Sequence, residues 1–72
     1  MTVSPVRPLT PTQARVAQLV ALGKTYIEIG ADLSMAPHTV RHHVYDIANL
    51  LPDDGLPQYR RVQRWAAHTN AA

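Results

Sequence analysis

This 72-residue sequence has no cysteine, no apolar run approaching the roughly 20 residues that span a bilayer, and no signal peptide at its N-terminus. The absence of cysteine excludes a disulfide framework and thiolate metal sites. We therefore expect a soluble protein without a membrane segment that acts in the cytoplasm. A Gly-rich phosphate loop and a cysteine nucleophile are also missing, and so short a chain cannot enclose a pocket. These absences predict that the protein is not an enzyme and has no cofactor.

Charged residues are few, and their distribution is uneven. Seven Lys and Arg against five Asp and Glu give a net charge of +2, and the last acidic residue is Asp54. Arg60, Arg61 and Arg64 follow it without a compensating acid. A chain of this length forms one small domain, and such a domain buries only about 60% of its unfolded surface. We expect a compact, all-α fold.

The stretch from Thr25 to Leu51 predicts two short amphipathic helices joined by about three residues, which is the pattern of a helix-turn-helix. Pro37 suits the first turn of a helix and disrupts a helix interior, so the second helix should begin there. Its apolar residues have the spacing of one helical stripe, which predicts a helix over residues 37–51. That stripe consists of Val40, Val44, Ile47 and Leu51.

The opposite stripe of the predicted helix 37–51 is polar and has no acidic member. It consists of His38, Arg41, His42, Tyr45 and Asn49. A helix that packs on one side and presents hydrogen-bond donors on the other suits the groove of a nucleic acid. Arg41 carries a two-pronged donor that matches guanine O6 and N7. The alternative is a solvated helix charge that pairs with Asp46 or another neighbour.

Local signals delimit a first helix. Thr10 can cap it, Pro11 suits its first position, and Gln13 completes a capping-box pattern. Gly23 is a natural left-handed stop. The predicted buried stripe consists of Val16, Leu19, Val20 and Leu22. The proline-containing residues 1–8 should form a flexible N-terminal arm ahead of a domain at 9–69, and residues 70–72 should fray.

A fourth helix is predicted over residues 58–68, after the turn-forming residues 52–57. Trp65 either closes the small core or, with Tyr59 and Val62, takes part in a two-fold contact between copies. The arginines of this helix could contact phosphates or an acidic partner.

Residues 9–51 resemble the LuxR-type helix-turn-helix domain of bacterial response regulators and quorum-sensing activators. The resemblance rests on Leu9-Thr10-Pro11, Gly23, Glu28-Ile29, Leu33 and the run Pro37-x-Thr39-Val40-Arg41-x-His43-Val44. Region 4 of sigma factors is similar through the first three helices but usually lacks the His-Val pair. Three features depart from the family pattern, namely Gly30, Ile27 and the pair Met35-Ala36. The last of these weakens the cap of the third helix.

The resemblance implies a small four-helix, LuxR/GerE-like domain without a wing, whose third helix enters the major groove of double-stranded DNA. It also implies a homodimer through the fourth helix. The residues expected to contact DNA are Lys24, Thr25, Tyr26, His38, Thr39, Arg41, His42, Tyr45 and Asn49. No receiver or ligand-binding domain precedes the motif, so we expect a stand-alone transcription regulator of a bacterial cell or its phage.

Two other interpretations fit parts of the sequence less well. His38, His42 and Asp46 are spaced four apart, but successive helical turns spread them too far to hold one metal ion, so no metal site is expected. A protein-interaction module is the second function class, with RNA polymerase, a sigma factor or another regulator as the partner. Ile27 and the Arg-rich last helix motivate it.

Overall fold

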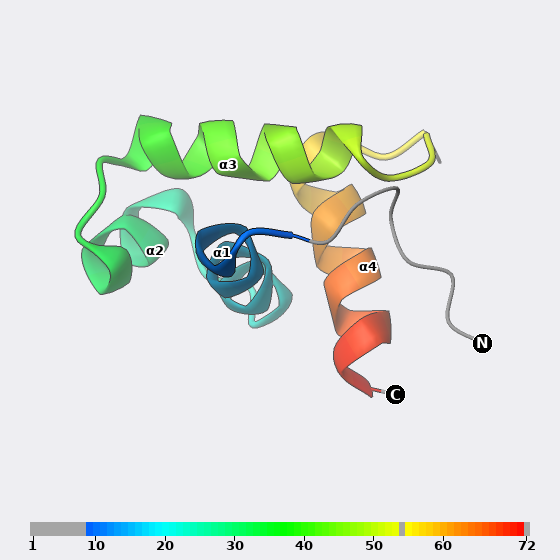
Figure 1. The fold of residues 1–72 in the computed structure, drawn as a ribbon, viewed down its shortest axis with the longest axis horizontal. Coiled ribbons are helices and arrows are strands. Elements are labelled where there is room, and N and C mark those ends of the chain that lie inside the picture. The colour runs from blue at the N-terminus through cyan, green and yellow to red at the C-terminus, as the bar shows by residue number, and fades with distance from the viewer. Residues whose placement is uncertain (1–8, 54, 72) are drawn as a thin grey trace.

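The computed structural model of the chain describes residues 9–53 and 55–71, which fold into four helices. These are α1 (Pro11–Ala21), α2 (Tyr26–Leu33), α3 (Pro37–Asn49) and α4 (Gln58–Ala71). The described segments contain no strand, so the predicted all-α class is confirmed. Helix α3 lies along one edge of the molecule, with α1, α2 and α4 on the same side of it (Figure 1). The predicted arm, residues 1–8, lies outside the described residues.

Helix α1 begins as its sequence predicts. The Thr10 hydroxyl accepts from the Gln13 amide at 3.1 Å, and the Gln13 side chain accepts from the Thr10 amide at 3.1 Å. Gly23 has φ +82, which confirms the left-handed stop. The prediction that Leu22 is buried is wrong, because the helix ends at Ala21 and the Leu22 side chain is 72% exposed.

The turn between α2 and α3 is tightened by two backbone features. Helix α2 ends at Leu33, and Ser34 adopts the left-handed conformation with φ 57 and ψ 45. A Cβ on Gly30 would collide with the carbonyl oxygen of Met35, so the glycine allows the turn to fold back against α2. The departure from the family pattern at residue 30 therefore has a steric reason. The atom that a side chain at this position would meet belongs to the turn between α2 and α3.

Helix α3 begins at Pro37, as predicted, and Ala36 at its N-cap makes no side-chain hydrogen bond. The predicted end at residue 51 is two residues late, because α3 ends at Asn49 and Leu50 is its C-cap. Leu51 lies in the following bend, yet its side chain still packs against the core.

The core lies where α1, α3 and α4 meet, and α2 closes one end of it against α3. Its buried members are Val16, Ala17, Val20, Ile29, Val40, Val44, Ile47, Ala48, Val62 and Ala66. Helix α4 packs against both α1 and α3. It continues to Ala71, three residues beyond its predicted end, so Asn70 and Ala71 are helical where a frayed end was expected; Ala72 lies outside the described residues.

Candidate nucleic-acid interface

Helix α3 presents a polar face to solvent. Its exposed side chains are His38, Arg41, His42, Tyr45, Asp46 and Asn49, and Thr39 is half-buried at the edge of this group. On the opposite side the predicted stripe is inside the core, with Val40, Val44 and Ile47 fully buried. Packing therefore orients α3 so that the whole set of predicted base-reading side chains is accessible. We call residues 38, 39, 41, 42, 45 and 49 of this surface the α3 face; Asp46 is also exposed but is acidic and is not counted among them.

Arg41 is free to meet a ligand. No residue within the described ranges forms an ion pair with it, so the alternative pairing with Asp46 does not occur. The Arg41 charge lies near Tyr26 of α2. Burial raises the pKa of Tyr26 above its ordinary value of 10.0, the neighbouring Tyr45 and Tyr59 raise it further, and the positive charge of Arg41 opposes this rise. Arg41 and Tyr45 on α3 are therefore within electrostatic reach of Tyr26 at the start of α2.

The N-terminus of α2 forms the second part of this surface. Thr25 caps the helix: its hydroxyl accepts from the Glu28 amide at 3.1 Å, and the Glu28 carboxylate accepts from the Thr25 amide at 2.8 Å. Because the Thr25 hydroxyl acts as an acceptor in this box, its own hydrogen can still be donated to an anion. The positive end of the helix dipole lies at the same place.

Lys24 is already engaged within the molecule. Its ammonium group donates to the Asp32 carboxylate at 2.7 Å, and this hydrogen bond is the main cause that raises the pKa of Lys24 above 10.5. The carbonyl of Lys24 accepts from the Tyr59 hydroxyl at 2.7 Å. A phosphate contact by Lys24 therefore requires the ammonium group to leave Asp32. The sequence pattern did not predict this ion pair.

The three side chains expected at a two-fold contact lie mostly inside the chain. Val62 is fully buried, so its predicted contact with a partner is wrong. Tyr59 is half-buried and meets Tyr26 edge to face, with ring centroids 5.7 Å apart and planes at 71°. Trp65 is half-buried and packs against the core, in agreement with the structural interpretation of this residue.

Arg61 has a structural role that sequence reasoning missed. Its guanidinium group donates to the Leu56 carbonyl at 3.0 Å and the Ala48 carbonyl at 3.5 Å, and it contacts the Asp53 carboxylate at 3.3 Å. These contacts hold the loop after α3 against α4. No local sequence pattern could have predicted these contacts, because they depend on how the loop after α3 folds back onto α4.

Two further structural features concern clusters that could bind a metal and helices that could span a membrane. Among the residues that the structure describes, no three His, Cys, Asp or Glu side chains are grouped to hold a metal ion. Over the same ranges, no helix has both the length and the apolar character needed to cross a membrane.

A short helix packed against a longer one through a three-residue turn, with the polar face of the longer helix open, defines a helix-turn-helix DNA-binding domain. The family model of bacterial regulatory proteins of the luxR family, named GerE, matches residues 7–52, which is more than half of the chain. The chain belongs to this family, whose helix-turn-helix is a DNA-binding domain of transcription regulators.

The match ends at Pro52 and so spans α1, α2 and α3 but not α4. No curated protein and no solved structure shows a significant match to the chain.

Proposed function

We propose that α3 of this regulatory domain inserts into the major groove of double-stranded DNA through the α3 face. Arg41, His42 and Tyr45 lie at the middle of this face and would meet base edges. His38 and Thr39 at the entrance of the helix, and Asn49 at its end, would meet the sugar-phosphate backbone. The observation that carries the proposal is the exposure of this donor-rich face directly opposite a fully buried stripe.

The start of α2 would anchor the domain on a phosphate. Thr25 offers a hydroxyl and the helix a positive dipole end, and Tyr26 lies close to Arg41. Lys24 would supply a further contact after exchanging Asp32 for a phosphate oxygen. Phosphate contacts fix the register of a protein on the duplex, and base contacts select the sequence.

The residues of α4 disfavour a homodimer through residues 58–68. Val62 is buried, and the hydroxyl and ring of Tyr59 are used within the chain. The exposed residues of α4 include Arg60 and Arg64, and a two-fold contact through this face would bring like charges into the same interface. We propose instead that one copy of this 72-residue chain recognises one site, in the cytoplasm where bacterial DNA lies.

A fluorescence titration of random-sequence duplex with the purified chain tests the proposal. We expect binding at low salt, with the logarithm of the association constant falling linearly as the logarithm of the salt concentration rises, with a slope of about −0.9 for each phosphate contacted. A double variant, Arg41→Ala with His42→Ala, should bind more weakly than the matched control Arg15→Ala, which changes an exposed arginine on α1. Absence of binding at low salt, or binding that ignores salt, would refute the proposal and favour the interaction-module interpretation.

A further inference from the structure

The permanent charges on the exposed side of α3 cancel. Within Pro37–Asn49 the permanently charged side chains are Arg41 and Asp46, one of each sign, and both are exposed. His38 and His42 are exposed as well and lie one helical turn apart, so they share one stripe of the helix. The charge that this side of α3 presents to a polyanion therefore depends on whether the two imidazoles are protonated.

Packing of α3 points these imidazoles outward. A helix has about 3.6 residues per turn, which places His42 opposite the stripe of Val40, Val44 and Ile47. That stripe is fully buried, so a duplex lying against α3 meets His42 directly. The remaining titratable groups of this helix are half-buried His43 and exposed Tyr45.

The two acids of α2 are engaged elsewhere in the chain. The Glu28 carboxylate accepts from the Thr25 amide at 2.8 Å, and Asp32 is held by Lys24 at 2.7 Å. Burial raises the pKa of Tyr26 on the same helix above 10.0, so its hydroxyl stays neutral in the range in which imidazole titrates. Helix α2 therefore offers no free carboxylate to the imidazoles of α3.

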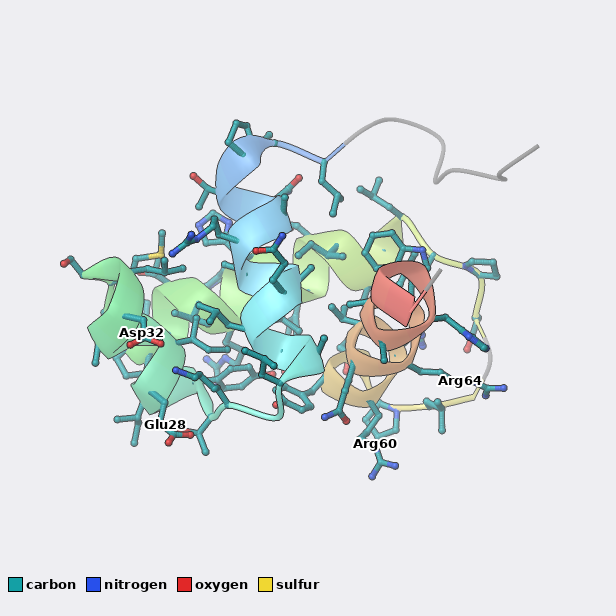
Figure 2. The ribbon with its side chains drawn as sticks, turned by 90° about the horizontal axis from the view of Figure 1, so that it is seen from below. Glu28, Asp32, Arg60 and Arg64 are labelled. Carbon is teal, nitrogen blue, oxygen red and sulfur yellow. The ribbon has the colours of Figure 1, made fainter. Side chains whose placement is uncertain are left out.

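The other helices packed against α3 contain no acidic residue. Viewed from the side opposite α3, Glu28 and Asp32 lie on one side of the molecule and Arg60 and Arg64 on the other (Figure 2). Neither His38 nor His42 has a hydrogen bond or ion pair with another group in the described part of the chain. Both imidazoles can therefore take up a proton when an anion reaches them. The charged and titratable groups of α1 and α4 are Arg15, Tyr59, Arg60, Arg61, Arg64 and His68.

We propose that duplex binding by the α3 face takes up protons on His38 and His42, so that the affinity for DNA rises as the pH falls. This inference rests on the function proposed above for the same face. A neutral imidazole has one donor and one acceptor, whereas an imidazolium has two donors and a positive charge. Phosphate oxygens and guanine O6 and N7 are acceptors, so the protonated form pairs better with the duplex. Imidazole changes its charge between about pH 5 and pH 8, and the affinity should change over this range.

Fluorescence titrations of random-sequence duplex at constant ionic strength, at about pH 8 and about pH 5.5, test the proposal. The association constant should be about tenfold or more higher at the lower pH. Its salt dependence should also become steeper there, by about 0.9 for each phosphate that an imidazolium contacts. Binding with the same constant at both pH values would overturn this inference and leave the function proposed for the α3 face standing. Absence of binding at both would overturn the two together.

Removal of the titrating groups identifies them. The double variant His38→Gln with His42→Gln keeps hydrogen-bonding side chains at both positions, and it should bind with nearly the same constant at both pH values. The matched control is His68→Gln, which removes an exposed imidazole from α4 and should keep the pH dependence of the parent chain. If the dependence survives in the double variant, the titrating group lies elsewhere and the proposal fails.

A permanent charge at the same positions gives the opposite result. His38→Lys with His42→Lys carries both charges throughout the range, so it should bind more tightly than the parent chain at the higher pH and gain little at the lower one. Circular dichroism at both pH values verifies that the helices of every variant are retained. If the lysine chain binds at the higher pH no better than the glutamine chain, the duplex does not respond to charge at these positions, and the proposal is overturned.

Discussion

Gly30 and Met35 fit against each other at the turn of the helix-turn-helix. The Met35 amide donates to the Gly30 carbonyl at 2.8 Å, and the Met35 carbonyl oxygen occupies the space that a Cβ on residue 30 would need. The turn between α2 and α3 is therefore closed directly over a helical glycine. This contact sets where α3 begins relative to α2, and with it the position of the α3 face.

Replacing Gly30 with alanine should destabilise the domain, although alanine is the better helix former. The new methyl group meets backbone, which cannot move aside cheaply, and overpacking of this kind costs about 1–3 kcal/mol. Urea unfolding followed by circular dichroism measures the free energy of unfolding. The control is Ala31→Gly on the exposed side of α2, which should cost about 1 kcal/mol through helix propensity alone. A Gly30→Ala chain more stable than the parent would show that propensity outweighs the contact.

Ala36→Ser should stabilise α3 by about 1 kcal/mol, because the N-cap of this helix has no side-chain hydrogen bond and already has extended backbone angles of φ −67 and ψ 147. The serine hydroxyl can accept from an amide of the first turn without any change in backbone. Thermal unfolding gives the change. The matched control is Ala31→Ser, at an exposed position within α2, and it should be neutral or slightly destabilising. Equal effects at the two positions would argue against capping.

Tyr59→Phe should lower the free energy of unfolding by about 1 kcal/mol at neutral pH, since it removes the hydrogen bond to the Lys24 carbonyl. Tyr45→Phe, on the exposed α3 face, should change stability little.

The same hydroxyl predicts a loss of stability at alkaline pH. Burial is the main cause that raises the pKa of Tyr59 above 10.0, with a smaller contribution from Glu28. A raised pKa means that the folded state holds this proton more tightly than the unfolded state does. Stability is then complete below the ordinary tyrosine pKa and declines as the pH rises through the higher, folded value. Tyr59→Phe should make this decline shallower in unfolding curves measured at increasing pH, and an unchanged slope would rule out Tyr59 as its source.

Arg41→Ala should weaken binding to a preferred duplex, selected from random sequences, by about 10- to 100-fold, because a two-pronged arginine contact to guanine is worth about 1–3 kcal/mol. Binding to random duplex should fall less. Arg41→Lys keeps the charge and loses the planar fork, so it should recover random binding better than specific binding. Since Arg41 has no ion pair in the described part of the chain, neither variant should change stability. An equal loss of affinity for both duplexes would show that Arg41 contacts phosphate and not a base.

The amino-acid sequence determined the features that depend on neighbours a few residues away. Thr10 and Thr25 cap their helices with amides three positions ahead, Pro37 starts α3, and Gly23 ends the turn after α1. The spacing of apolar residues in α3 likewise determined which side faces the core, and so which side forms the α3 face. These signals act within one or two helical turns, and tertiary packing did not override them.

Tertiary structure decided which residues far apart in the sequence contact one another. Tyr59 reaches the carbonyl of Lys24, 35 positions earlier, and Arg61 reaches that of Ala48, 13 positions earlier, only because α4 crosses both α1 and α3. The same crossing buries Val62, which the helical pattern alone could not assign to the core or to a partner. For α4, helical periodicity specified which residues share a side, but only the helices packed against it determined that Val62 meets the core and not a partner.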